Sequence, residues 1–460
     1  MASISALGVG SGLDLSGLVD QLQAAERQKL VPILEQQSAQ KTKISAYGRL
    51  QSAMDRVQTS IAALNDASTF AQQKSTVTGE GVLASAGETA NAGRYDITVS
   101  QLARSGSVAS NSVALNQELT TAETTLTLDF GATYNDDGEF NSGADPLSSK
   151  TIKLAANSTL ADIRDQINAD KELGVTASIV NDGSGYRLAL SYKETGKDAS
   201  LVGFSGLAEL TMDDATLRPG QDAELNVNGI AITSNTNRVE GAIQGVTLDL
   251  TAASESPVTL VIERDEESLR GAIDEFVKNY NEMKSTVGRM TAFNGEGETS
   301  GELVGDRTVR TIENRLRRDI TESLGGGDIS RLSQLGIEID VRGRLTVDDA
   351  KLGDAVANNP EGLSAFFASD SKEAGFAGRL NATLESITAD SGIIQSSVNS
   401  AEQRIESLDQ RKLRMESSIE RSVERYRKQF AQLDGMLAQM NSMSEYLFQQ
   451  FSMLNNMQKN

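Results

Sequence analysis

The strongest pattern in the chain is a run of apolar residues three or four positions apart over residues 398–460. The run contains no proline and a single glycine, Gly435. This spacing places apolar side chains on one side of an α-helix, and its persistence is typical of helices that pack lengthwise against others. We therefore predict one long C-terminal helix. Its apolar positions are Val398, Ala401, Ile405, Leu408, Met415, Ile419, Val423, Tyr426, Phe430, Leu433, Leu437, Met440, Met443, Leu447, Phe451 and Leu454.

The character of this helix changes halfway along. Charged residues of both signs are frequent up to Lys428, but between residues 429 and 458 only Asp434 and Glu445 are charged. Five of the 11 methionines fall within the last 25 residues. Their flexible side chains suit an interface with more than one neighbour, and they would equally suit a plain helical core. A helix without a charged outer face is expected to meet neighbours on several sides, so the pattern indicates an assembly element.

A shorter helical pattern begins the chain. Leu15, Leu18, Val19 and Leu22 lie at positions i, i+3, i+4 and i+7, and residues 11–14 form a possible capping box. We expect Pro32 to interrupt this first helix. A second apolar stripe over residues 44–64 predicts another helix, which could pack antiparallel against part of residues 398–430.

The pattern changes to alternation from about residue 75. Short alternating segments at residues 95–99, 126–128, 225–227, 246–250 and 258–262 are separated by Gly, Asn, Asp and Ser. Such segments predict antiparallel strands with frequent turns, interrupted by one helix near residues 159–168.

Helical periodicity returns at residues 268–290 and 307–324, followed by a predicted hairpin around Arg342-Gly343-Arg344. We therefore expect an α+β multidomain fold: terminal helices form a coiled-coil or helical-bundle leg, with two antiparallel β-rich domains in the middle. The expected domains are residues 1–40 with 429–460 as a terminal helical segment, disordered until assembly; 41–70 with 263–428 as the helical leg containing the hairpin near 337–347; 71–110 with 221–262 as a β-rich domain; and 111–220 as an inserted β-rich domain.

Composition narrows the function. The chain has no histidine, cysteine or tryptophan, which excludes Ser-His-Asp and Cys-His catalysis, disulfides and the usual zinc, copper and haem sites. The net charge is −21, and residues 71–262 hold 25 acidic against 12 basic side chains, so we expect no nucleic-acid binding. No apolar run reaches the ~20 residues that span a membrane, so we expect no membrane insertion. The first 20 residues lack the features of a Sec signal peptide.

Several short motifs suggest chemistry and are better explained otherwise. The glycine-rich residues 8–12 follow no strand and lack the lysine of a phosphate loop. Ser38 and Lys41 match one motif of penicillin-recognising enzymes without its companions. Residues 135–139 and 181–183 offer oxygen ligands without EF-hand spacing, and are typical of turns. No particular pair among the many carboxylates is singled out as a glycosidase acid and base. We expect no catalytic residue, cofactor or metal, and no enzyme.

Four stretches in order resemble the bacterial flagellar filament-capping family, hook-associated protein 2 (FliD). The first is Gly8-Val-Gly-Ser-Gly-Leu-Asp14 with Leu18-Val-Asp-Gln-Leu22. The second is residues 228–237 with 245–250, the third is residues 336–340 with 343–348, and the fourth is residues 425–434 with 440–447. Residues 160–168 are similar to a motif of flagellar hook and filament proteins. Residues 111–220 otherwise match weakly.

The resemblance implies a ring-like homo-oligomer at the distal tip of the filament, where it helps arriving flagellin fold and insert. It implies flagellin, hook–filament junction proteins and an export chaperone at the C-terminal helix as partners. It also implies type III export without a cleaved signal peptide. The expected assembly residues are Leu15, Leu18, Val19, Leu22, Tyr426, Phe430, Leu433, Leu437, Met440, Leu447, Phe451 and Leu454. Two alternatives remain: a secreted adhesin whose acidic β domains bind host glycans, and another flagellar axial protein.

Overall fold

The structure, a computed structural model, describes residues 13–131, 145–254, 256–293, 295, 300–324, 327–369 and 374–457. Of residues 454–457 only the backbone is described. The chain divides into two units, Met1–Phe70 with Ser268–Asn460, and Ala71–Glu267. Within the described residues, no helix has both the length and the apolar character needed to cross a membrane.

The helical unit begins with α1 (Leu15–Arg27), which starts after Asp14. The Asp14 carboxylate accepts a hydrogen bond from the Gly17 backbone N–H at 2.9 Å, and so caps the helix. A 3₁₀ turn, Gln28–Leu30, leads into α2 (Val31–Leu64). Pro32 lies in the first turn of α2, where its missing N–H has no intrahelical partner to lose. The expected break near Pro32 is confirmed, and α2 begins well before the apolar stripe at residue 44.

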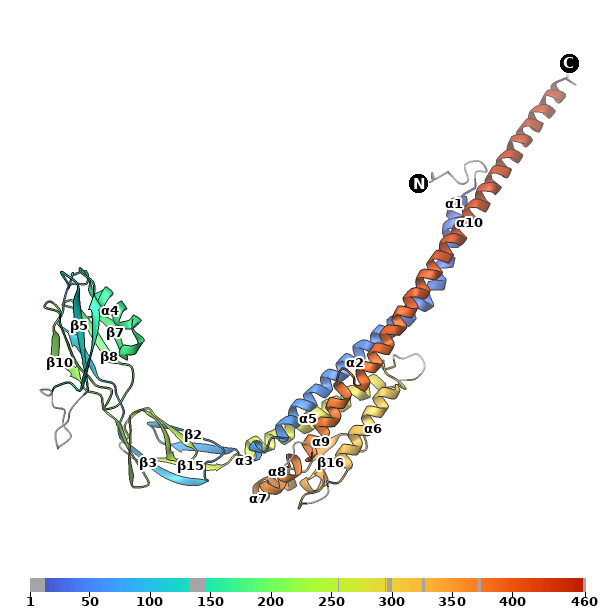
Figure 1. The fold of residues 1–460 in the computed structure, drawn as a ribbon. Helices are drawn as coiled ribbons and strands as arrows, with labels where there is room; N and C mark the ends of the chain where they lie inside the picture. Colours follow the sequence, from blue (N-terminus) through green and yellow to red (C-terminus); the bar gives the residue numbers. More distant parts are fainter. Residues whose placement is uncertain are drawn as a thin grey trace. The chain divides into compact units, whose positions relative to one another are not determined.

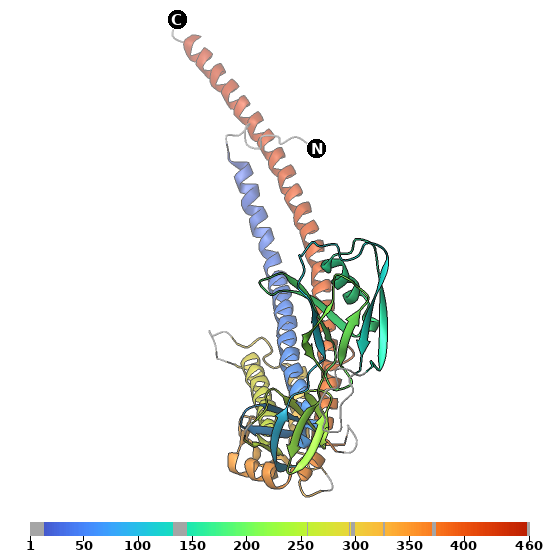
Figure 2. The ribbon, with the colours of Figure 1, turned by 90° about the vertical axis from the view of Figure 1, so that its left-hand side faces the viewer.

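The longest element is α10 (Ile393–Met457), a helix of 65 residues. At 1.5 Å per residue it is roughly 98 Å long. It runs beside α2 and then α1 (Figures 1 and 2). Gln37 of α2 contacts Asp409, whereas the earlier Val19 of α1 packs with Ile419, so the helices are antiparallel. The predicted long helix and its antiparallel packing are confirmed.

A compact helical core surrounds the start of α10. Phe70, Phe276, Phe366, Phe367 and Phe376 meet there in stacked and edge-to-face pairs. The predicted hairpin is present as two strands joined at a left-handed Gly343 with φ of 77°. The elements here are α3 (Ser68–Ala71), α5 (Glu266–Thr291), α6 (Arg307–Thr321), a 3₁₀ turn (Leu332–Leu335), β16 (Ile337–Ile339), β17 (Leu345–Val347), α7 (Asp349–Asn358), α8 (Pro360–Phe367) and α9 (Phe376–Thr388).

The second unit is β-rich and contains two hydrophobic cores. One core lies between the sheets β1-β15-β3-β11-β12 and β13-β14-β2. The other is formed by β10-β4-β8-β7, β6-β5-β9 and α4 (Leu160–Ala169). Every pairing between these strands is antiparallel, as predicted.

The strands of the first core are β1 (Gln73–Thr78), β2 (Val82–Ala86), β3 (Gly93–Gln101), β11 (Ala223–Val227), β12 (Ile230–Ser234), β13 (Arg238–Ile243), β14 (Val246–Leu250) and β15 (Val258–Arg264). Those of the second are β4 (Ser107–Ser110), β5 (Thr124–Phe130), β6 (Ser148–Leu154), β7 (Val175–Asn181), β8 (Tyr186–Tyr192), β9 (Leu201–Ser205) and β10 (Met212–Arg218), with a 3₁₀ turn at Lys171–Leu173.

One expected boundary is wrong. The inserted domain was expected to begin at residue 111, but β4 already belongs to it, because β4 pairs with β8 and β10. Val108 is buried in the second core, opposite Leu190. The boundaries expected at 40/41 and 428/429 fall inside α2 and α10. The rest of the domain division stays a prediction. So does the hypothesis that the terminal segment becomes ordered only on assembly.

Candidate functional site

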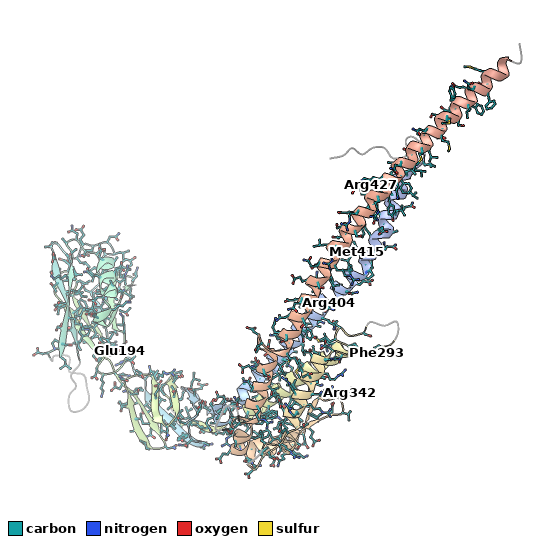
Figure 3. All side chains as sticks on the ribbon, turned by 45° about the vertical axis from the view of Figure 1, so that its right-hand side comes forward. Glu194, Phe293, Arg342, Arg404, Met415 and Arg427 are labelled. Carbon is teal, nitrogen blue, oxygen red and sulfur yellow. The ribbon has the colours of Figure 1, made fainter. Side chains whose placement is uncertain are left out.

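The first candidate surface is the seam between α1 and α10. Val19 is buried against Ile419 and Val423, and Leu30, Met415 and Phe430 pack against these three residues. Figure 3 labels Met415 partway along α10. Each helix turns its apolar stripe toward the other, so the seam excludes water without help from another chain.

This seam bears on two of the expected assembly residues. Leu15 and Val19 are only 4% and 2% exposed, so both are already buried within a single chain. Their partner is α10, which runs antiparallel to α1 and is long enough to reach it. Leu18, on the same predicted stripe, is 43% exposed.

Beyond Phe430 most apolar side chains of α10 are exposed instead of buried. We call residues 429–457 of α10 the apolar tail; here α10 continues past the first turn of α1 (Figure 1). Leu433, Met440 and Phe451 are 42%, 60% and 69% exposed. From residue 439 to residue 453 every side chain is classed as exposed. The tail therefore presents a long apolar surface that the described residues of its own chain do not cover.

The predicted assembly residues thus separate into groups. Leu15 and Val19 are buried in the seam, and Leu22, Tyr426, Phe430 and Leu437 are half-buried. Leu18, Leu433, Met440, Leu447 and Phe451 are exposed. The side chain of Leu454 lies outside the described residues. The burial pattern is compatible with an interface at the exposed positions, and the assignment of these residues to assembly stays a prediction.

Sequence reasoning missed part of the apolar surface. Tyr446 and Phe448 are 61% and 79% exposed on the tail, and Val31 and Leu34 are exposed on α2. These residues lie off the predicted stripe at helical spacing. The scarcity of charge in the tail, where only Asp434 and Glu445 are charged, was the signal that could have identified Tyr446 and Phe448.

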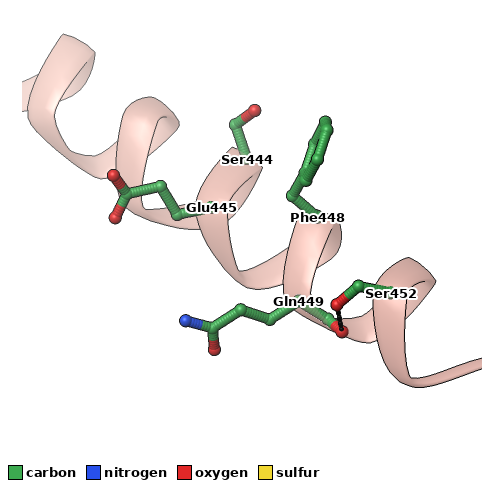
Figure 4. A pocket seen from close by; sticks show the side chains of 5 residues that line it. All are labelled: Ser444, Glu445, Phe448, Gln449 and Ser452. Carbon is green, nitrogen blue, oxygen red and sulfur yellow. Dashed lines mark hydrogen bonds between the residues drawn. The ribbon is translucent and has the colours of Figure 1, made fainter. Parts of the chain in front are cut away.

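The tail also carries a shallow hollow of about 450 Å³ (Figure 4). It is lined by Ser444, Glu445, Phe448, Gln449 and Ser452, all from one helix and all exposed. The Ser452 hydroxyl donates a hydrogen bond to the Gln449 carbonyl at 2.8 Å. Ligand pockets normally bury most of their ligand between several elements. This hollow is a contact surface of a helix, with one carboxylate and no second group to act with it.

The candidate calcium turn at residues 181–183 has a structural role. The Asp182 carboxylate accepts hydrogen bonds from the Ser184 and Gly185 backbone N–H groups, and it forms an ion pair with Arg187 at 2.5 Å. Asp213 pairs with the same guanidinium at 2.6 Å. The described residues contain no cluster of three or more carboxylates that could hold a metal ion. The other two motifs, at residues 8–12 and 135–139, lie outside the described residues.

The remaining candidates are also structural. Ser38 and Lys41 lie exposed on α2. Asp348 caps α7, and Asp349 forms an ion pair with Arg270. Burial, together with a 2.7 Å hydrogen bond to Asp306, raises the pKa of Tyr47 to about 12. A phenol held in its neutral form in this way stabilises the fold and does not act as a base at neutral pH.

Comparison with known protein families gives three matches. Residues 11–106 match the flagellar hook-associated protein 2 N-terminus, and residues 220–442 match its C-terminus. Residues 132–193 match the flagellin hook IN motif. The N- and C-terminal matches cover the helices of the seam and most of the first β core. The match to the flagellin hook IN motif lies in the second β core.

Individual relatives agree. The chain is 33% identical to flagellar hook-associated protein 2 of Escherichia coli K12 over 475 residues, covering 98% of each chain. It is 33% identical to that of Salmonella typhimurium over 489 residues, covering 99% of this chain and 100% of the relative. The solved D1-D2-D3 domains of the E. coli flagellar cap protein FliD superimpose with a TM-score of 0.64 at 29% identity, covering 78% of this chain and 99% of that one. Identity over nearly the full length and a shared fold lead to one conclusion: this chain belongs to the flagellar hook-associated protein 2 (FliD) family of flagellar cap proteins.

Proposed function

We propose that this chain is a structural cap of the bacterial flagellar filament, acting as a ring of several copies at the distal tip. The observation that carries the proposal is the apolar tail, which follows a stretch of α10 that is packed against α1 and α2. The family relationship and this unpartnered surface together support attachment through the tail. Arriving flagellin would then fold and insert beneath the ring, and the ring would prevent its loss.

The energetics support a covered tail. Burying one leucine side chain contributes about 1.5–3 kcal/mol. A helix with exposed leucine, methionine and phenylalanine around its circumference is therefore most stable when other helices surround it. Its neighbours in this proposal are the tails of other copies and the end of the filament. The mechanism is steric and conformational, with no covalent step and no enzyme activity.

The wider setting is also part of the proposal. The chain would reach the tip by flagellar type III export without a cleaved signal peptide. A dedicated chaperone would cover the C-terminal helix before export, and hook–filament junction proteins would be neighbours at early stages of growth. The adhesin and other axial-protein alternatives are not favoured, because the full-length relatives are named hook-associated protein 2.

A pair of substitutions tests the tail. Leu437 is half-buried on the stripe that includes Leu433 and Met440, whereas Gln439 is exposed and lies on the opposite side of the helix. Leu437→Asp is expected to weaken attachment or ring assembly, because a buried charge costs more than the leucine contributes. Gln439→Asp should be nearly silent, although it adds the same charge within the same turn. Both variants are compared by their swimming motility and by the amount of flagellin that the cells release into the medium. Equal values in the two mutants would exclude this stripe as an interface.

A further inference from the structure

The helical unit contains a basic groove between α5 and the hairpin. The groove has a volume of about 690 Å³. Its two walls are fixed to each other by Asn281, whose side chain donates to the Leu345 carbonyl and accepts from the Leu345 N–H, both at 2.8 Å. The charged lining residues are Lys278, Lys284, Arg289, Arg342 and Arg344, with Glu282 as the acidic one.

Three of these cations have no carboxylate partner within the part of the chain that the structure describes. Lys284 pairs with Glu313 at 2.5 Å, and Arg344 pairs with Asp340 at 3.2 Å. By contrast, Lys278, Arg289 and Arg342 form no ion pair with any carboxylate of the described residues. Arg289 donates only to the hydroxyls of Ser285 and Thr286, at 2.9 and 3.0 Å. Positive charge that no described carboxylate neutralises attracts an anionic partner.

The surroundings of the groove suit a protein partner. Ala292 lines one end, and the next residue, Phe293, is 73% exposed. At the hairpin the neighbour of Arg342, Val341, is fully exposed. Phe293 and Arg342 both belong to the helical unit (Figure 3). Exposed aromatic and aliphatic side chains beside arginine are typical of the centre of a protein–protein interface.

The floor of the groove contains Gly288, in the interior of α5. A glycine there destabilises the helix relative to alanine. A Cβ at Gly288 would meet no other atom within 4 Å, so packing inside the chain does not require the glycine. Its absence of a side chain leaves room for another backbone to approach α5.

We propose that this groove binds the acidic β-rich middle of a second copy of the chain, within residues 71–262. That region holds 25 acidic and 12 basic residues, so its charge complements the groove. A closed ring built from identical copies by head-to-tail contacts needs two different complementary surfaces on each copy. The inference rests on the proposed ring and assigns one of its two surfaces.

A single-cysteine experiment identifies the occupant. The chain has no cysteine, so Val341→Cys can be labelled with a benzophenone maleimide in the full-length protein without side reactions. Mixing labelled chains with ¹⁵N-enriched unlabelled chains and irradiating them should give cross-linked peptides from residues 71–262 of the other copy. Cross-links to residues of the helical unit, or to flagellin alone when it is added, would overturn the proposal. Absence of any cross-link between copies in assembled rings would do so as well.

Charge reversal then tests the role of the cations. The double variant Arg289→Glu with Arg342→Glu should shift the ring–monomer equilibrium at least tenfold toward monomer. The matched control reverses Arg404 and Arg411, two exposed arginines of α10 that pair with no described carboxylate. Sedimentation at 50 and 300 mM salt should show wild-type rings weakened by salt. Equal ring content in the two double variants would refute the assignment.

Gly288→Ala tests the groove without changing its charge and without destabilising the fold. It should stabilise α5, as Gly271→Ala on the same helix outside the groove should, yet only Gly288→Ala should weaken the ring. If the groove variants form normal rings while wild-type chains still cap filaments, the groove assignment fails and the proposed function stands. If wild-type chains do not restore filaments to a strain lacking the cap, the proposed function itself fails.

Discussion

At the residue scale, Arg187 links three segments of the chain around the second β core. Its guanidinium joins Asp182 in the β7–β8 turn, Asp213 in β10 and the Ser110 carbonyl of β4. The guanidinium, with the Ser184 hydroxyl and backbone N–H, lowers the pKa of the Asp182 carboxyl well below its ordinary range. Because the folded form holds the charged carboxylate, this contact stabilises the fold at neutral pH.

Replacing Arg187 should therefore change how stability depends on pH. The contribution from Asp182 is present above its unfolded pKa, near 3.9, and is lost progressively as the pH falls below that value. Arg187→Met should reduce the free energy of unfolding at pH 7, and the deficit should shrink toward pH 2. Hydrogen exchange of the β7 and β8 amides at the two pH values measures this as a local free energy of opening. Arg164→Met is the control, because Arg164 pairs only with the adjacent Asp165. A deficit that is the same at both pH values would contradict the ion-pair account.

At the element scale, α2 and α10 are joined by a polar contact. Gln37 is buried in α2, and its side-chain amide donates to the Asp409 carboxylate at 2.6 Å. Asp409 is exposed and can be hydrated without its partner. Gln37→Leu should therefore change local stability by less than about 1 kcal/mol or increase it, since a leucine fills the seam. A single polar residue in a helical seam fixes register more than stability.

Hydrogen exchange of the α2 amides measures that prediction, because a chain with several units does not unfold in one step. Gln37→Ala is the matched variant, which removes the same amide and leaves a cavity. It should lower protection by about 1 kcal/mol or more. A loss in Gln37→Leu as large as the loss in Gln37→Ala would show that the hydrogen bond itself, and not the packing of the side chain, stabilises the contact between the two helices.

The same scale shows what the sequence could and could not predict. The long helices were predictable because their apolar stripes persist over many turns, and the turn at Gly343 because its flanking strands alternate clearly. The strand β4 was not predictable from the sequence, because Ser107–Ser110 contains one large apolar residue and its pairing with β8 is long-range. The basic groove was also unpredictable, because Lys278 and Arg342 come together only through the packing of the hairpin on α5.

The candidate site shows a related limit. The stripe on the tail identified Leu433 and Met440, which the structure leaves exposed, and the stripe on α1 identified Leu15 and Val19, which it buries. Periodicity indicates that a face will be covered, but it does not distinguish cover by the same chain from cover by another. That distinction depends on the length of α10 relative to α1, and on the residue at which the two helices part.

At the scale of the whole molecule, attachment and ring formation should be separable. A chain lacking residues 429–460 loses the apolar tail but keeps the groove and Val19, Ile419 and Val423 of the seam. Neither β core contains a residue of the deleted segment. We expect the truncated protein to fold, to show native hydrogen-exchange protection in residues 71–262, and still to form rings through the groove. Cells that carry it should swim poorly and release flagellin monomer into the medium, because the ring no longer holds to the filament. Normal filaments in those cells would refute attachment through the tail, and a folded truncated protein that stays monomeric would show that the tail, and not the groove, holds the ring together.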